Sequence, residues 1–312
     1  MTQNKIKLSI VISTKDRSQI LTRCLDSLVD QTKNMKDVEV IIINNNSSDG
    51  TVKLTHRYIG KFTNWRLVTE TQLGLSYARN RGWKESRGIY VAYIDDDAIA
   101  KNDWVSQIIT FINSSPEIGI FGGPYTSYTI SPKASWLPKE YGTHSLGNKT
   151  REVHIGKEWI NGTNMVFKKK LLKKFGGFDT GLGMKGKKIS YGEEANLLLR
   201  MYLAGVPVYY CPKIKVKHLI PDYKNNLIWQ LKNQFAIGYS WYPTHIKKAN
   251  FPVSIYTLLR SIKNTFSYLV DSTRIPLKRR VYLSLSGLIQ EIGVFTWHLS
   301  SVFNKSTPEN EK

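Results

Sequence analysis

The chain has 312 residues, enough for one large α/β domain with an appendage or for two modest domains. Its two cysteines, Cys24 and Cys211, lie far apart in the sequence, which excludes a disulfide framework and fits a reducing, cytoplasmic compartment. The formal net charge of +21 indicates an anionic partner, and charge alone does not distinguish nucleic acid, an anionic membrane surface and a phosphorylated ligand.

The first hundred residues alternate strand-like and helix-like segments. Strands are expected at residues 8–13, 38–43, 65–69 and 89–94, with helices between them at 18–31, 50–58 and 73–85. The apolar stretch at 8–12 is too short for the hydrophobic region of a signal peptide, so it is interpreted as the first strand. This alternation predicts βαβ units and a mostly parallel sheet flanked by helices.

Three consecutive carboxylates, Asp95, Asp96 and Asp97, follow the apolar strand at 89–94. In open α/β sheets, ligands bind at the carboxyl ends of the strands, so these acids are expected at a ligand-binding edge. Grouped carboxylates repel one another unless a cation neutralises them, and oxygen ligands suit Mg²⁺ or Mn²⁺. An acidic turn or a helix cap is the structural alternative for this stretch alone.

Polar residues also follow the first and second strands, at the same edge of the predicted sheet. The turn at 47–50 is ordinary capping chemistry, which makes Asn44 and Asn45 the better ligand candidates after the second strand. The candidates after these two strands are Ser13, Thr14, Asp16, Arg17, Asn44 and Asn45.

The middle of the chain departs from this regular alternation. A helix is expected at 102–113, and strands at 118–125, 152–155 and 159–167. The segment at 181–191 combines glycines with lysines and is expected to be a mobile, cationic loop. It contains a GxGxxG match, but no strand precedes it and no helix follows it, so we reject a dinucleotide-binding motif there.

Two acids, Glu193 and Glu194, begin a helix that is expected to end at Leu203. Helical spacing places Glu194 on the stripe of Leu198 and Met201, and Glu193 on the polar side, so Glu194 is predicted to face inward. A structural cap is the alternative for such an acid. His218 follows a strand-like segment at 213–217 and is a candidate metal ligand, although a lone histidine is more often structural.

The last ninety residues contain two apolar stripes of helical period, at 255–269 and 281–302. Arg260 and Lys263 interrupt the first stripe, and Glu291 interrupts the second, so neither predicts a transmembrane span. The basic junction at 278–280 favours an anionic membrane surface as the partner of these helices. Packing on the domain or on a second copy of the chain is the alternative.

The order of the motifs resembles family 2 inverting glycosyltransferases, whose fold is called GT-A, and is similar to their bacterial members over roughly residues 7–242. The motifs are Thr-Lys-Asp-Arg at 14–17, Asn-Asn-Asn-Ser-Ser-Asp-Gly at 44–50, Ala-Arg-Asn at 78–80, Asp-Asp-Asp at 95–97, Asn-Gly-Thr-Asn-Met at 161–165, Gly-Gly-Phe-Asp at 176–179 and Gly-Glu-Glu at 192–194. The resemblance implies a donor-binding half at 1–98, an acceptor-binding and catalytic half at 99–222, and C-terminal amphipathic helices at 223–312.

The resemblance also implies a nucleoside diphosphate sugar as donor, with a UDP-sugar favoured, and a glycan or lipid-linked acceptor in cell-surface polysaccharide or glycoconjugate synthesis. Asp97 with Asp95 would hold Mg²⁺ or Mn²⁺ on the diphosphate, and His218 would complete the metal site. The implied donor-binding residues are Ser13, Thr14, Asp16, Arg17, Asn44, Asn45, Arg79, Asp95 and Asp96, and the implied acceptor or donor-sugar residues are Asn161, Gly162 and Asn164.

Glu194 matches the family's general base, with Glu193 as the neighbouring candidate, and a single displacement by the activated hydroxyl would invert the anomeric centre. The family usually has Asp in place of Glu194 and in place of Asn44 or Asn45. Two other classes remain as alternatives. A nucleotidyltransferase would need a Gly-rich phosphate loop after the first strand, and this chain lacks one. A nucleic-acid-binding protein would not place three acids at its binding edge, so no nucleic-acid partner is expected.

Overall fold

The structure is a computed structural model that describes residues 5–186, 188–241, 251–271 and 275–304. Within these ranges, an eight-stranded sheet has the strand order β3-β2-β1-β4-β9-β6-β10-β8, and a smaller sheet has the order β5-β11-β7. The strands are β1 (Leu8–Thr14), β2 (Val38–Asn44), β3 (Trp65–Thr69), β4 (Tyr90–Ile94), β5 (Ala98–Ala100), β6 (Ile120–Gly122), β7 (Tyr125–Tyr128), β8 (Arg151–Glu152), β9 (Asn164–Lys168), β10 (Tyr209–Tyr210) and β11 (Val216–Leu219).

The large sheet is mostly parallel, as predicted. Strands β3, β2, β1 and β4 run in one direction, and β9 is antiparallel to both of its neighbours, β4 and β6. The helices are α1 (Ser18–Thr32), α2 (Thr51–Ile59), α3 (Leu75–Glu85), α4 (Trp104–Ser114), α5 (Lys169–Lys174), α6 (Glu193–Leu203), η1 (Asp222–Asn225), α7 (Leu227–Ala236), η2 (Ile237–Trp241), α9 (Phe251–Asp271) and α10 (Leu277–Asn304).

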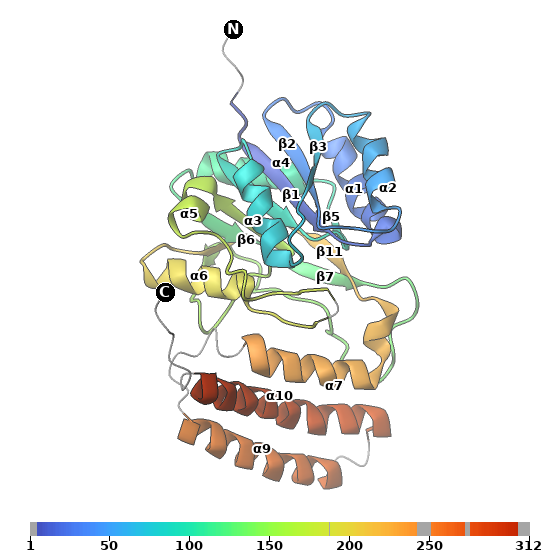
Figure 1. Ribbon diagram of the computed structural model, residues 1–312, viewed down its shortest axis with the longest axis vertical. Helices are drawn as coiled ribbons and strands as arrows, with labels where there is room; N and C mark the ends of the chain where they lie inside the picture. The colour runs from blue at the N-terminus through green and yellow to red at the C-terminus, as the bar shows by residue number, and fades with distance from the viewer. Residues whose placement is uncertain (1–4, 187, 242–250, 272–274, 305–312) are drawn as a thin grey trace.

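Alternating side chains of the central strands supply two hydrophobic cores, one on each face of the large sheet. Ile10 packs with residues of α1 and α4, whereas its neighbour Val11 packs with residues of α3 and α6. Figure 1 shows these helices on the two sides of the sheet. Covering both faces leaves the carboxyl edge of the strands as the place where polar side chains can meet a ligand.

The second half differs from the prediction at its short strands. The expected strand at 118–125 is divided between β6 and β7, which belong to different sheets. The break lies at Gly123, where a Cβ atom would lie 1.8 Å from the carbonyl oxygen of Ile214. Residues 1–98 and 99–222 both contribute strands to the large sheet. The predicted division at 98/99 and 222/223 into functional regions stays a prediction.

The C-terminal helices form a separate layer in which α10 lies between α7 and α9 (Figure 1). The backbones of α10 and η2 approach closely, because a Cβ atom on Gly238 would lie 1.9 Å from the carbonyl oxygen of Gln290. Both predicted amphipathic helices are therefore present, and one of them packs on the rest of the chain. None of the helices within the described ranges has an apolar stretch long enough to cross a bilayer.

Candidate functional site

A cavity of about 590 Å³ opens at the carboxyl edge of β1, β2 and β4. Many of the predicted site residues line it, namely Ser13, Thr14, Asp16, Arg17, Asn45, Asp95, Asp96, Asp97 and His218. The other lining residues are Lys15, Leu73, Gly74, Leu75, Ala78, Met184 and Gly186. The hydroxyl oxygen of Ser13 is buried and has no hydrogen-bond partner in the described part of the chain, so it is available to a ligand.

Asp95, Asp97 and His218 form a cluster at one end of this cavity. Their potential ligand atoms lie within 4.8 Å of one another, and His218 Nε2 lies 3.1 Å from Asp97 Oδ1. Strand β11 creates this proximity by pairing His218 with Ala98, directly after the acids. Burial would raise the pKa of Asp97, but the charge and hydrogen bond of His218 lower it to about 2. Two carboxylates and an imidazole fit a divalent cation.

Asp96 lies beside this cluster and is only 8% exposed. Burial, followed by repulsion from Asp97, raises the pKa of Asp96 to about 7, although the charge of Arg17 opposes the shift. Burial therefore favours the protonated form of this carboxyl, which can donate a hydrogen bond to a ligand in the cavity.

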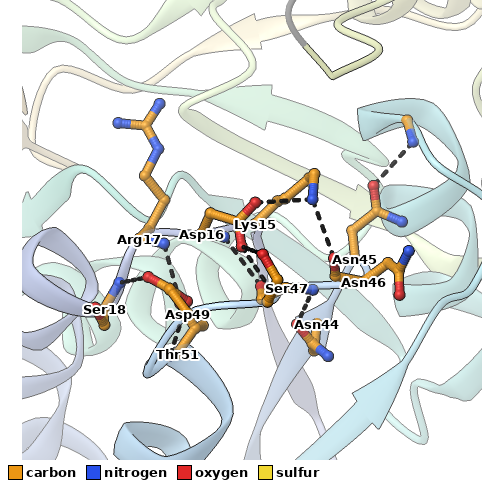
Figure 2. A network of polar contacts seen from close by, with 12 residues as sticks. Lys15, Asp16, Arg17, Ser18, Asn44, Asn45, Asn46, Ser47, Asp49 and Thr51 are labelled. Carbon is orange, nitrogen blue, oxygen red and sulfur yellow. Dashed lines mark hydrogen bonds and ion pairs between the residues drawn. The ribbon is translucent and has the colours of Figure 1, made fainter.

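The loops after β1 and β2 form the other wall of the cavity, and hydrogen bonds join these two loops to each other (Figure 2). Asp16 has a φ of 52° and accepts a hydrogen bond of 2.7 Å from the backbone N–H of Ser48. Asp49 accepts hydrogen bonds from the backbone N–H groups of Ser18 and Thr51. The segment at 47–50 therefore makes the turn and capping contacts expected from its sequence.

Asn44 and Asn45, the predicted ligand candidates after β2, make hydrogen bonds to the backbone of the neighbouring loops. Asn44 Oδ1 accepts a hydrogen bond of 3.0 Å from the N–H of Ser47, and Asn44 does not line the cavity. Asn45 lines the cavity but donates to the carbonyls of Glu70 and Gln72 and accepts from the N–H of Gly74. The loops need these amide groups because their backbone donors and acceptors lack partners in the sheet.

Arg79 does not line the cavity itself but contacts Asp95, which does, so its predicted contact with the nucleotide stays a prediction. It is 3% exposed, with Nη1 2.7 Å from Glu193 Oε1 and Nη2 3.1 Å from Asp95 Oδ1. Glu194 Oε2 lies 3.9 Å from Nη1. Three carboxylates thus surround one buried guanidinium. The guanidinium links Asp95, a candidate metal ligand, to the two acids of α6.

The prediction that places Glu193 on the polar side of the helix is wrong, whereas the carboxylate of Glu194 does point inward, with a buried Oε2 atom. Glu193 is 4% exposed and lies one turn before the buried Leu197, whereas the side chain of Glu194 is 21% exposed. The loop at 181–191 adds cover, because a Cβ atom on Gly183 would lie 3.0 Å from the Glu193 carboxylate. Burial and then the charge of Glu194 raise the pKa of Glu193 well above its usual range, although Arg79 opposes them.

The segment at 161–164 supports the site from outside the cavity. Asn164 is fully buried, donates to the carbonyls of Pro124 and Ile214, and accepts from Trp104 Nε1, so it offers no atom to a sugar. Asn161 Oδ1 accepts a hydrogen bond from the N–H of Thr163. A Cβ atom on Gly162 would lie 2.7 Å from Arg79 Nη2. This backbone therefore packs on the arginine and holds its guanidinium in place.

Several contributors to the cavity region were not predicted as site residues, among them two residues of the loop at 181–191 and Lys224. Met184 and Gly186 line the cavity, and the carbonyl of Met184 accepts a hydrogen bond of 2.9 Å from the N–H of Leu75. Lys224 of η1 is buried near Asp97, and its burial lowers its pKa while Asp97 opposes that shift. The glycines among lysines at 181–191 predicted a cationic loop without assigning Met184 or Gly186 to the site, whereas no local pattern marks Lys224.

Sequence comparison finds relatives of this chain among sugar-transferring enzymes. The family described as Glycosyl transferase family 2 matches residues 9–176. A glucosyl-dolichyl phosphate glucuronosyltransferase from Haloferax volcanii is 26% identical over 248 residues, which cover 75% of this chain and 76% of that protein. The family match thus spans the donor-side loops and the aspartates.

Two solved structures have a similar fold. A mannosyltransferase from Pyrobaculum calidifontis, in complex with GDP-Man and Mn²⁺, aligns with a TM-score of 0.55 and 15% identity over 97% of this chain and 76% of that one. S. aureus TarS 1-349, in complex with UDP-GlcNAc, aligns with a TM-score of 0.56 and 14% identity over 96% of this chain and 92% of that one. These similarities support the fold, and the roles of individual residues depend on the geometry of the site.

Proposed function

The chain belongs to glycosyl transferase family 2 and has the GT-A fold, and from this premise we propose that it transfers a sugar from a nucleoside diphosphate sugar to a hydroxyl acceptor with inversion. The observation that carries the proposal is the meeting of Asp95, Asp97 and His218 at one end of a cavity whose other wall is formed by the loops after β1 and β2. A nucleotide placed along these loops would direct its diphosphate toward the cluster.

The cluster is proposed to hold a divalent metal through Asp97, Asp95 and His218. Its two carboxylates suit Mg²⁺ and Mn²⁺ alike, whereas an imidazole ligand is more typical of transition metals, which favours Mn²⁺. When bound, the metal would neutralise charge that develops on the diphosphate leaving group. Arg17 lines the same cavity and contributes a fixed positive charge beside Asp96 and Asp97.

Glu194 is proposed as the general base. It is more exposed than Glu193, and its Oε2 atom is 3.9 Å from Arg79, beyond hydrogen-bonding distance. Glu193 instead makes a 2.7 Å contact with Arg79 and is proposed to position the guanidinium. Glu194 would take the proton of the acceptor hydroxyl as its oxygen attacks the anomeric carbon from the face opposite the leaving diphosphate.

The experiment that tests this function measures nucleotide release from UDP-, GDP- and dTDP-sugars with Mn²⁺, with Mg²⁺ and with EDTA. We expect metal-dependent release from one of these donors, with a UDP-sugar favoured. A nucleotidyltransferase, the second candidate, would instead release pyrophosphate from a nucleoside triphosphate. Release of pyrophosphate from a triphosphate, together with stable nucleotide sugars, would contradict the proposal.

The acceptor is proposed to be a glycan or a lipid-linked saccharide, as in the synthesis of cell-surface polysaccharides and glycoconjugates. The Haloferax relative is named for action on a glucosyl-dolichyl phosphate, which supports a lipid-linked acceptor. The exposed apolar stripe of α9, formed by Ile255, Tyr256, Leu259 and Ile262, supports attachment to the cytoplasmic face of an anionic membrane. Exposed Arg260 and Lys263 lie beside this stripe.

Vesicle sedimentation tests the membrane attachment. The protein should bind vesicles that contain anionic lipid, bind less at high salt, and lose binding in the double variant Tyr256→Ser and Leu259→Ser. The matched control is Leu203→Ser with Ile130→Ser, because these two residues are equally exposed but lie outside the stripe. If the wild type stays in the supernatant and instead forms a dimer that the stripe variant dissociates, then the stripe is the interface of a homo-oligomer.

A further inference from the structure

A second cavity, of about 550 Å³, lies behind the strand that carries His218. In β11, Lys217 pairs with Ile99 and the next residue, His218, pairs with Ala98. Lys215, Val216 and Lys217 line the second cavity, whereas the next residue, His218, lines the first. A single strand therefore separates the acidic donor cavity from this second cavity.

The second cavity is cationic. Lys101, Lys215 and Lys217 line it together with His144, and none of its described lining residues is acidic. Lys101 Nζ lies 3.6 Å from the Asp103 carboxylate, whereas Lys215 and Lys217 make no salt bridge to any residue that the structure describes. Asn102, Ser145 and Asn148 add neutral polar groups to the wall. Lys215 and Lys217, which have no acidic partner among the described residues, therefore give this concave surface a positive charge that attracts an anion.

The second cavity also lies close to the proposed reaction centre. Tyr125 lines it, and the ring centroid of Tyr125 lies 5.6 Å from that of His218 in an edge-to-face arrangement. Burial, and then the charges of Glu194 and Asp95, raise the pKa of Tyr125 to about 12. The charges of the proposed base and of a proposed metal ligand therefore act on a residue of the cavity wall. A ligand in the second cavity would therefore be separated from His218, a candidate metal ligand, by the ring of Tyr125.

We propose that this cavity binds an anionic group of the acceptor, so that the acceptor carries a phosphodiester or a carboxylate near the hydroxyl that receives the sugar. The inference rests on the proposed glycosyl transfer and specifies its acceptor class. Other lysines, such as Lys170 and Lys173 of α5, also line a hollow, but that hollow contains neither Tyr125 nor His218, which link the Lys215–Lys217 cavity to the donor site.

The test is a calorimetric titration with three oligomers of similar length: a glycerol phosphate oligomer, an oligogalacturonate and a neutral maltooligosaccharide. Each titration is done with and without UDP and Mn²⁺, which fill the donor cavity. We expect saturable, salt-sensitive binding of the phosphodiester or of the carboxylate oligomer, and no binding of the neutral one. Whichever of the two anionic oligomers binds identifies the anionic group of the acceptor. Hydrogen exchange should show protection at residues 143–148 and 215–217.

The double variant Lys215→Gln and Lys217→Gln should weaken this binding roughly tenfold, equivalent to about 1.4 kcal/mol. The control, Lys213→Gln with Lys232→Gln, removes the same charge from exposed positions outside the cavity and should bind like the wild type. Equal weakening in both variants, protection of residues 13–17 in place of 143–148, or binding of neither anionic oligomer would overturn the proposal. Because these titrations need no turnover, they are independent of the nucleotide-release assay that tests the proposed function.

Discussion

The two carboxylate clusters of this chain contain the same chemical groups, but they are neutralised differently. At the end of β4, Asp97 contacts His218, and Asp95, Asp96 and Asp97 all line an open cavity. At the start of α6, Glu193 is paired with the buried Arg79, and neither glutamate lines that cavity. The first cluster therefore faces space that an external cation can enter, whereas the second has an internal cation.

Arg79 joins the clusters, because it contacts Asp95 and Glu193 at the same time. Burial would lower the pKa of Arg79, but the charges of Asp95 and Glu193 raise it, so the guanidinium stays charged. This contrast teaches that a group of acids is a candidate metal site where its carboxylates face open space, even though Arg79 also contacts Asp95, and not where a buried cation closes the group. The same comparison separates Asp95 and Asp97, which are expected to bind the metal, from Glu194, which is expected to accept a proton.

The largest effect is expected from Asp97→Ala, which removes an oxygen ligand from the open cluster. Metal-dependent nucleotide release should fall by more than about a hundredfold, because metal affinity is lost. Assays at increasing Mn²⁺ concentration measure this effect. Asp95→Asn, which keeps an oxygen at the site, should be milder. Equal losses in the two variants would assign the direct ligand differently.

Glu194→Gln should affect proton transfer without affecting donor binding. We expect transfer to an acceptor to fall by roughly 10²- to 10⁴-fold, the usual contribution of a general base, while the Kd for donor stays within about twofold. Single-turnover kinetics and calorimetry measure the two quantities. The matched control is Glu193→Gln. If Glu193→Gln abolishes transfer and Glu194→Gln does not, the buried acid is the base.

Arg79→Lys should weaken the link between the clusters. A lysine keeps the charge but lacks the fork that contacts two carboxylates, so the free energy of unfolding should fall by about 1–3 kcal/mol. Donor turnover should fall as well, because Asp95 loses its partner. Arg66→Lys is the control, since Arg66 also contacts two carboxylates, Glu39 and Glu85, away from the cavity. Turnover that falls equally in both variants would argue against a positioning role for Arg79.

The smallest effect, a change in the pH dependence of stability, is expected at Asp49, whose carboxylate accepts hydrogen bonds but forms no ion pair with a described residue. Burial would raise the pKa of Asp49, but hydrogen bonds from Thr51 and Ser18 outweigh it and lower the pKa to about 2. Because the folded pKa is below the unfolded value, the stabilisation is present above pH 4 and is lost as the pH falls toward 2. Asp49→Asn should therefore be less stable than the wild type at pH 6 and closer to it at pH 3 in urea denaturation. A constant difference would contradict this origin.

Local sequence patterns were sufficient to predict the strands and helices in the first half of the fold. Continuous apolar runs identify β1, β2 and β4, and the polar residues after them, including Asp97, do line one cavity. His218 could be selected because it is near a strand end. Its contact with Asp97 depends on the pairing of β11 with β5, a short strand that no local pattern marks.

Several predicted site residues have partners from distant parts of the chain that the sequence did not indicate. Arg79 meets Glu193, and Asn164 meets Trp104 and Ile214, so their burial depends on packing that helical or strand periodicity does not contain. For Glu193, the stripe through Leu198 ignored the equally buried Leu197 and the cover from the loop at Gly183. Short strands such as β10 also escape prediction, because two residues carry no periodic signal.

Binding of Mn²⁺, measured by electron paramagnetic resonance with and without UDP or GDP, tests the central claim most directly. The account predicts one nucleotide-dependent Mn²⁺ per chain, retained in Glu194→Gln and in Arg66→Lys, and weakened more than about a hundredfold in Asp97→Ala. His218→Ala should weaken it less, because two carboxylates remain. Unchanged Mn²⁺ binding in Asp97→Ala, or wild-type protein that binds the nucleotide without binding Mn²⁺, would contradict the assignment of the open cluster as a metal site.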